Sequence, residues 1–294
     1  MKIIGIGNAL VDVLTQLEDD NLLKALELPR GSMQLVNAAR AAQIQEKSKN
    51  LKKQMASGGS AANTIHGLAK LGMETAFIGN VGKDETGKFF EEDLKNSGIK
   101  PVLFYSDSPS GIANGMISPD GERTFGTFLG AALELSAGML SKSNFEGYDF
   151  LHVEGYLVQN HQLLTTILKL AKETGLKVSL DLASYNVVEE NLDFLHDMVK
   201  SYVDIVFANE EEAKAFTGKE PEEALTDIAN ITDIAIVKVG SKGSVIKQGD
   251  TTTRISPIKA HPVDTTGAGD LYASGFLYGL ANNLGFEKQS IITR

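Results

Sequence analysis

Asp264-Thr-Thr-Gly-Ala-Gly-Asp270, near the C-terminal end of the sequence, joins a glycine-containing turn to the start of a predicted helix. Backbone N–H groups at a helix N-terminus carry about half a positive charge, so they suit an anion such as a phosphate. Gly267, Ala268 and Gly269 are the predicted anion hole, and Asp270 lies beside it. A carboxylate there is suited to take the proton from a phosphoryl acceptor. The alternative is that Asp270 only complements the helix dipole, a role worth up to about 1 kcal/mol.

Upstream of this segment, short β-branched runs alternate with longer amphipathic segments. The runs predict strands buried on both faces, and the segments have helical spacing that ends at glycines. The predicted strands are Ile3–Gly7, Ala76–Val81, Phe150–Glu154, Val178–Leu182, Ile205–Ala208 and Ile234–Val239. The predicted helices are Ala61–Leu71, Glu85–Asn96, Leu163–Thr174, Leu192–Lys200 and Glu210–Phe216. This alternation predicts an α/β fold, a three-layer Rossmann-like arrangement with a mostly parallel sheet flanked by helices.

Two regions, approximately residues 11–54 and 100–130, depart from the alternation. The second contains the strand-like stretches Val102–Tyr105, Ile112–Ile117 and Arg123–Phe128, separated by turn signals such as Ser118-Pro-Asp-Gly121. We expect both regions to contribute to a small β-sheet inserted into a single domain that spans residues 1–294.

Composition narrows the classes of function. The net charge of −10 argues against nucleic acid or an anionic membrane as partner. Cysteine is absent, which excludes disulfides and thiolate zinc sites. No stretch approaches the roughly 18 apolar residues that a membrane span requires, and the apolar run at the start is too short for a signal peptide. A soluble, cytoplasmic protein is therefore expected.

Glycine-rich turns follow several predicted strands, and ligands of open parallel sheets bind beyond the carboxyl ends of the strands. Gly5-Ile-Gly7-Asn8 ends the first strand and Asp12 follows. A dinucleotide fingerprint needs a third glycine near position 10, where this chain has leucine, so NAD binding is disfavoured. Ser57-Gly-Gly-Ser-Ala-Ala-Asn63 opens a helix and suits a hydroxyl-rich ligand, or is only a glycine loop with a helix cap.

Two further segments have both a functional and a structural interpretation. Asn209-Glu-Glu-Glu212 places Glu212 where it could hold a metal–phosphate group through water, or is only an acidic first helical turn. Lys238-Val-Gly-Ser-Lys-Gly243 shapes a nucleotide pocket, or is only a hairpin turn. The sequence has no P-loop motif and no protein-kinase motifs, and its five histidines lack metal-ligand spacing.

Two segments in a fixed order make the chain recognisable: Gly58-Gly-Ser-Ala-Ala-Asn-Thr64 and Asp264–Asp270. Together with the alternation between them, they make the chain resemble the ribokinase-like (PfkB) carbohydrate kinase family from Met1 almost to its end. The resemblance implies the ribokinase-like fold and transfer of the γ-phosphate of ATP to a primary hydroxyl of a sugar or nucleoside. The inserted strands would be the lid over the acceptor site.

The same resemblance implies roles for individual residues. Asp270 would be the catalytic base, with the anion hole at Gly267, Ala268 and Gly269. The residues expected to bind the acceptor hydroxyls are Asn8, Asp12, Gly58, Gly59 and Asn63. The residues expected at the Mg²⁺ and ATP site are Asn209, Glu212, Lys238, Gly240 and Gly243. Asp264 would help to hold a monovalent cation such as K⁺ behind the anion hole.

The acceptor is less closely specified, because ribokinases, fructokinases and adenosine kinases share these motifs. Ile65-His-Gly-Leu-Ala-Lys-Leu-Gly72 and Gly121-Glu-Arg-Thr124 slightly favour the adenosine-kinase-like branch. Arg123 is a candidate to bind a phosphate from the lid, or is a solvated strand charge. The aromatic residues that could stack on a base are Phe104, Tyr105, Phe125 and Phe128, although aromatics in strands more often pack in cores.

Other functions stay open. A fructokinase-type or other sugar kinase has the same motifs. Family members usually continue past the catalytic helix, whereas this chain stops at Ile291-Ile-Thr-Arg294. A small-molecule-binding protein with little or no kinase activity is therefore the second class of hypothesis, although the intact Gly-Ala-Gly and Asp270 favour an enzyme. The resemblance also leaves open a homodimer formed through the lid.

Overall fold

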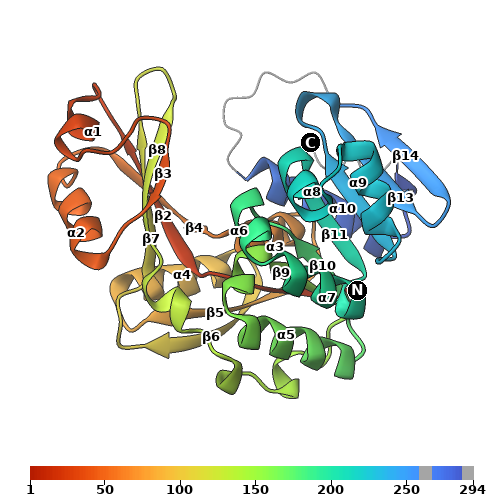
Figure 1. The fold of residues 1–294 in the computed structure, drawn as a ribbon. Coiled ribbons are helices and arrows are strands. Elements are labelled where there is room, and N and C mark those ends of the chain that lie inside the picture. Colours follow the sequence, from red (N-terminus) through yellow and green to blue (C-terminus); the bar gives the residue numbers. More distant parts are fainter. Residues whose placement is uncertain (258–266, 287–294) are drawn as a thin grey trace.

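The computed structural model describes residues 1–257 and 267–286. A nine-stranded sheet with helices on both faces forms the body of the molecule, and a five-stranded sheet stands beside it (Figure 1). The predicted α/β class with a small second sheet is confirmed. Among the described residues, no helix has the length and apolar character needed to cross a membrane.

The large sheet is parallel apart from the hairpin at one edge. Its strand order is β14-β13-β12-β11-β10-β9-β1-β5-β6, and β13 and β14 run antiparallel to their neighbours. The strands in chain order are β1 (Lys2–Ile6), β5 (Glu74–Gly82), β6 (Ile99–Ser106), β9 (Phe150–Glu154), β10 (Lys177–Asp181), β11 (Ile205–Asn209), β12 (Ile234–Lys238), β13 (Ser244–Gln248) and β14 (Thr251–Ile255).

Alternate strand residues enter two different cores, which is why the parallel strands are apolar almost throughout. In β1, Ile3 packs on one side of the sheet, while Ile4 and Ile6 pack on the other. The helices of the first side are α3 (Ser60–Lys70), α4 (Glu85–Asn96) and α10 (Ala268–Ala281). Those of the second side are α5 (His161–Glu173), α6 (Tyr185–Glu190), α7 (Leu192–Tyr202), α8 (Glu210–Thr217) and α9 (Pro221–Ala229).

Within the described residues, five short 3-10 helices lie in connections that lead to or from strands of the large sheet. They are η1 (Gly130–Glu134), η2 (Ala137–Met139), η3 (Lys142–Asn144), η4 (Gly155–Gln159) and η5 (Gly240–Lys242).

The small sheet has the strand order β3-β8-β7-β2-β4. Its strands are β2 (Leu10–Gln16), β3 (Met33–Leu35), β4 (Lys53–Gly58), β7 (Gly111–Ile117) and β8 (Arg123–Phe128). The helices α1 (Asn21–Ala25) and α2 (Ala38–Lys47) cover one face with a separate apolar cluster that includes Leu26, Ile44 and Met116. The opposite face includes a row of neighbouring residues across four strands, formed by Leu14, Gly115, Phe125 and Met33.

One predicted strand belongs to the other sheet. Val102–Tyr105 was expected in the small sheet, but it lies in β6, which pairs in parallel with β5 at the edge of the large sheet. Val102 and Phe104 pack against the large core, and the Tyr105 hydroxyl donates to Glu91 of α4. This prediction was wrong because a short strand pattern does not record which strand will be its neighbour.

The carboxyl ends of five neighbouring strands meet at one edge of the large sheet. β1 lies between β5 and β9, so the connections leave it in opposite directions and the sheet has a switch point there. The polar residues at or just after these strand ends are Asn8, Glu154, Asp181, Asn209 and Lys238. The fold therefore concentrates polar groups where ligands of such sheets bind.

Candidate active site

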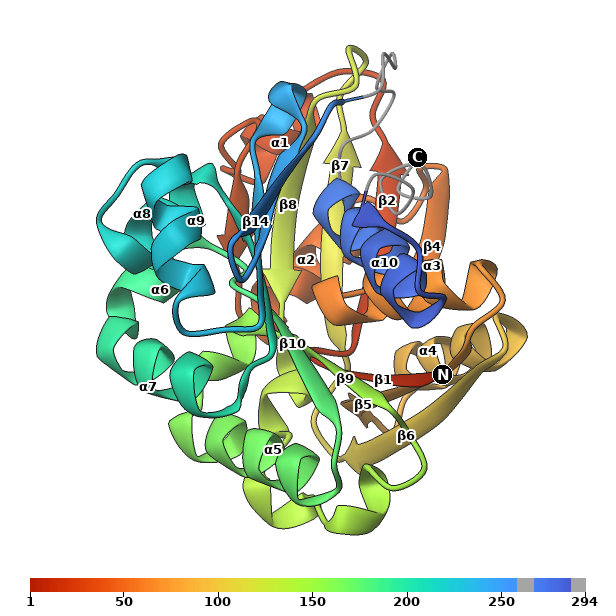
Figure 2. The ribbon, with the colours of Figure 1, turned by 90° about the vertical axis from the view of Figure 1, so that its right-hand side faces the viewer.

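Asp270 lies at the junction of two helices from opposite ends of the chain. Ser60 Oγ donates to Asp270 Oδ1 at 2.8 Å, and Asn63 Nδ2 donates to Asp270 Oδ2 at 2.9 Å. Both donors come from the first turn of α3, which packs beside α10 (Figure 2). Burial raises the pKa of the Asp270 carboxyl, and the two hydrogen bonds oppose that shift. Hydrogen bonds thus join the first turn of α3 to the first turn of α10, and each turn contains residues of one signature segment.

The residues predicted to form an anion hole lie at the start of α10. Gly267 is the N-cap residue and has φ of +71°, a left-handed conformation that glycine adopts without strain. Ala268 and Gly269 then begin the helix, and Asp270 is in its first turn. The helix start expected from the sequence is therefore observed.

Asp12 approaches this junction from the small sheet. A Cβ atom at Gly58 would lie 2.3 Å from Asp12 Oδ1, so only glycine leaves room for the carboxylate beside β4. Burial raises the pKa of Asp12 to about 6, Arg123 lowers it and the charge of Asp270 raises it. The charges of Arg123 and Asp270 therefore both act on the Asp12 carboxyl. The roles predicted for these three residues stay predictions.

The loop that contains Asn8 is held by a residue that sequence reasoning missed. Glu154 Oε1 accepts a hydrogen bond from Asn8 Nδ2 at 2.6 Å, and its Oε2 accepts from Ala61 N at 3.2 Å. The backbone at Gly59 lies directly against the Asn8 carbonyl, since a Cβ at Gly59 would be 2.2 Å from Asn8 O. Gly59 also has φ of +98°, a conformation that favours glycine. Burial raises the pKa of Glu154 to about 7. The available signal was a charged residue at the end of a predicted buried strand.

Asn209 and Glu212 form a capping box at the start of α8. Glu212 Oε2 accepts from Asn209 N at 2.8 Å, and Glu212 Oε1 accepts from Asn209 Nδ2 at 2.7 Å. Asn209 Oδ1 in turn accepts from Glu212 N at 2.8 Å. Burial and the charge of Asp181 raise the pKa of Glu212 to about 7. The acidic first helical turn expected for this segment is therefore observed, and the role of Glu212 toward a metal–phosphate group stays a prediction.

Lys238 ends β12 and pairs with Asp181 at the end of β10. Lys238 Nζ donates to Asp181 Oδ2 at 3.0 Å, and both side chains are mostly buried. Asp181 is the second residue that sequence reasoning missed, although the strand that ends there was predicted. Beyond Lys238, Gly240 and Gly243 form the tight turn of the β12–β13 hairpin, where Gly243 N donates to Gly240 O.

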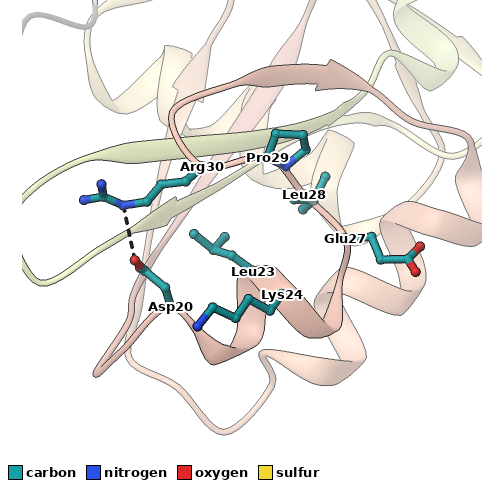
Figure 3. Close-up of a pocket in the computed structure, with 7 residues that line it drawn as sticks. All are labelled: Asp20, Leu23, Lys24, Glu27, Leu28, Pro29 and Arg30. Atoms are coloured by element: carbon teal, nitrogen blue, oxygen red, sulfur yellow. Dashed lines mark ion pairs between the residues drawn. The ribbon is translucent and has the colours of Figure 1, made fainter.

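Asp264, the predicted cation ligand, lies outside the described residues. No group of three or more His, Asp or Glu side chains suited to a metal ion occurs in residues 1–257 and 267–286. A pocket of about 370 Å³ lies elsewhere, in the helical cover of the small sheet (Figure 3). It is lined by α1 and the segment that follows, and an ion pair joins Arg30 to Asp20 beside it. None of the predicted site residues lines this pocket.

Comparison with known proteins identifies the family to which the chain is similar. The model of the pfkB family carbohydrate kinases matches residues 32–289. A ribokinase of Lactococcus lactis subsp. lactis is 32% identical over 240 residues, which cover 78% of this chain and 74% of the relative.

Two solved structures share the fold over nearly the whole chain. The adenosine kinase from Sinorhizobium meliloti is 31% identical, with a TM-score of 0.87 over 99% of this chain and 91% of that one. A probable sugar kinase from Rhizobium etli is 32% identical, with a TM-score of 0.87 over 99% of this chain and 90% of that one.

Proposed function

Because this chain belongs to the pfkB family of carbohydrate kinases and is an ATP-dependent kinase of a sugar or nucleoside, we propose that it phosphorylates a primary hydroxyl with Asp270 as the base. The observation that carries this assignment is the clamp on Asp270, in which Ser60 and Asn63 each donate to one carboxylate oxygen. A carboxylate that only complements a helix dipole needs no such orientation. A base needs it, because proton transfer depends on position before it depends on pKa.

The reaction follows from the charges at the site. The acceptor oxygen attacks the γ-phosphorus while its proton passes to Asp270, and ADP leaves. Phosphoryl transfer is mostly a matter of positioning and charge neutralisation, which the N-terminus of α10 supplies from the protein side. Closure of the small sheet over the acceptor would exclude water, which otherwise competes as the acceptor.

Mg²⁺ bound with ATP neutralises charge on the phosphates. The residues present fit such an ion held through water. Glu212 is 3% exposed, and both of its carboxylate oxygens already accept hydrogen bonds from Asn209. Magnesium commonly keeps several waters and is held by one or two carboxylates together with substrate phosphates. We therefore place Asn209 and Glu212 in the outer shell of the metal.

We favour a nucleoside as the acceptor, because the face of the small sheet opposite α1 and α2 combines a carboxylate with an apolar surface. Asp12 lies in a row with Ala113, Thr127 and Leu35 of the neighbouring strands. The next row is the apolar one formed by Leu14, Gly115, Phe125 and Met33. A carboxylate beside an aromatic and aliphatic surface suits a ribose joined to a base, whereas a free sugar needs only the carboxylate.

An acceptor panel tests this proposal. Acceptor-dependent ADP formation from MgATP is measured with adenosine, inosine, ribose and fructose, and the product is examined by phosphorus NMR. We expect the highest kcat/KM with a nucleoside, and a phosphorus signal split by the two protons of a CH₂ group. A higher kcat/KM with ribose or fructose would favour a sugar acceptor. Tight binding without acceptor-dependent ADP would favour a binding protein.

Three further features stay predictions. A homodimer through the small sheet has some support in the exposed Met33 and Leu35 at its edge. The monovalent cation site at Asp264 and a cytoplasmic location are predicted from the sequence alone. Sedimentation of the purified chain, and its activity in potassium compared with tetramethylammonium salts, would test the first two.

A further inference from the structure

The Lys238–Asp181 pair lies directly against the start of α10. A Cβ atom placed on Gly269 would be 3.1 Å from Lys238 Nζ. Gly269 is the second residue of α10, so the ammonium group lies beside the first turn of that helix. The pair therefore borders the proposed anion hole, although β12 and α10 are separate elements of the chain.

This arrangement puts two positive features together. A helix N-terminus carries about half a positive charge, so a cation beside it is normally unfavourable and an anion is favourable. Lys238 nevertheless stays charged. Burial lowers its pKa, but the charges of Asp181 and Glu212 outweigh that effect, so the pKa is raised overall. An anion between the ammonium group and the helix would be stabilised by both.

Asp181 accounts for the position of the ammonium group. Its side chain is 8% exposed and that of Lys238 is 18% exposed, so the carboxylate is the more deeply placed partner. Asp181 Oδ1 also accepts a hydrogen bond from Ala183 N at 3.0 Å, which fixes the carboxylate. The ammonium group of Lys238 is consequently held by Asp181, while the Lys238 side chain stays partly exposed to solvent.

We propose that Lys238 is a catalytic residue whose ammonium group contacts the transferred phosphoryl group, and that Asp181 is its positioning residue. The inference rests on the proposed kinase function. As the bond from the acceptor oxygen to the γ-phosphorus forms, the bond from that phosphorus to the β,γ-bridging oxygen breaks, and the acceptor proton passes to Asp270. Lys238 donates to a γ-phosphoryl oxygen throughout and exchanges no proton.

The competing explanation is that Lys238 only neutralises buried Asp181. The two explanations differ in the double variant Asp181→Asn/Lys238→Met, which removes both charges. A buried ion pair can often be replaced by neutral groups without loss of stability, whereas removing one partner leaves an uncompensated charge. Neutralisation alone therefore predicts that the double variant regains the kcat that Lys238→Met loses. A catalytic contact predicts that the double variant stays slow.

The experiment compares kcat, acceptor KM and thermal midpoint for the parent, Lys238→Met, the double variant and Lys169→Met, a control on the exposed face of α5. We expect the double variant to recover the thermal midpoint while its kcat stays about 10²–10³-fold below the parent, the usual loss for one donor to a developing charge. Its acceptor KM should remain within a few-fold, and Lys169→Met should match the parent.

A second readout is independent of how well the variants fold. The Lys238→Ala variant is assayed with added methylammonium, which can occupy the vacated space. Recovery of kcat with increasing methylammonium, and not with tetramethylammonium, is expected. A double variant with parental kcat, or an absence of rescue in a folded Lys238→Ala variant, would overturn the assignment. Either result would leave the kinase function standing, whereas an inactive parent would count against the kinase function itself.

Discussion

At the scale of single residues, the site depends on carboxylates whose environments differ. Asp12 is the clearest case, because it is half-buried, has a pKa raised to about 6 and lies against Gly58. An ionised carboxylate accepts two hydroxyl hydrogen bonds, and losing such a charged contact costs about 1.5–3 kcal/mol. The role of Asp12 is therefore measurable separately from that of Asp270.

Replacing Asp12 by Ala should lower kcat/KM for the acceptor about 10- to 150-fold, the range that corresponds to this energy. The KM for ATP should change little, because the residues proposed to bind the nucleotide lie at other strand ends. In the parent, acceptor kcat/KM should also fall as the pH drops below about 6, where Asp12 gains a proton. Asp107→Ala, at a side chain 92% exposed, is the matched control. An Asp12→Ala variant with weakened ATP binding and unchanged acceptor kinetics would place the acceptor elsewhere.

At the scale of elements, α3 and α10 begin within the two signature segments, and they must pack closely to bring Asn63 beside Asp270. A Cβ at Gly67 of α3 would lie 2.3 Å from Ser274 Oγ of α10. Ser274 Oγ also donates to Thr64 O at 2.8 Å, so its position is fixed. The geometry of the Asp270 clamp therefore depends on a small residue one turn further along α3.

Gly67→Ala should separate the two helices and lower both stability and kcat. Overpacking costs about 1–3 kcal/mol, and alanine recovers up to about 1 kcal/mol of helix propensity, so a net loss of up to about 2 kcal/mol is expected. Urea unfolding and steady-state kinetics measure the two effects. Gly138→Ala is the control, since a Cβ at that position meets nothing within 4 Å. If Gly67→Ala keeps the stability and kcat of the parent, the interface between α3 and α10 can accommodate the added methyl group without separating the helices.

The sequence predicted the positions of the helices and strands better than it predicted which residues of different elements would be in contact. Strand and helix positions follow from local periodicity. The glycine-rich turns indicate where α3 and α10 start, and so place Asn63 and Asp270 in the first turns of these helices. The hydrogen bond between those two residues spans 207 positions, and no local pattern records it. Glu154 and Asp181 escaped notice for the same reason. A charged residue at a strand end becomes a site residue only when parallel pairing sets it beside others, as it does for these two.

At the scale of the whole molecule, one sheet edge collects carboxyl groups whose pKa values are raised. Burial raises the pKa of Glu154 from 4.5 to about 7, and that of Glu212 also to about 7. Between pH 4.5 and about 7, these two carboxyl groups hold protons in the folded protein that they have released in the unfolded chain. The free energy of unfolding contributed by such a group therefore falls as the pH rises from about 4.5 to 7.

Glu154→Gln isolates this contribution, because its amide cannot ionise and fills nearly the same volume. Relative to the variant, the parent should lose up to about 1.4 kcal/mol of unfolding free energy per pH unit across this window. Urea unfolding of both proteins at pH 5, 6 and 7 gives the difference directly. His152, whose pKa burial lowers to about 4, acts with the opposite sign but equally in both proteins. A difference that is independent of pH would show that Glu154 is ionised throughout.

The most direct test of the central claim is kcat of Asp270→Asn, measured with MgATP and the best acceptor at saturation. If Asp270 is the base, kcat should fall by at least about 10²-fold, while the acceptor KM stays within a few-fold of the parent value. The asparagine retains the size of the side chain, so the fold and the helix interface should persist. A kcat within a few-fold of the parent, with a stability loss of about 1 kcal/mol or less, is what a dipole-only role predicts. That result would contradict the account.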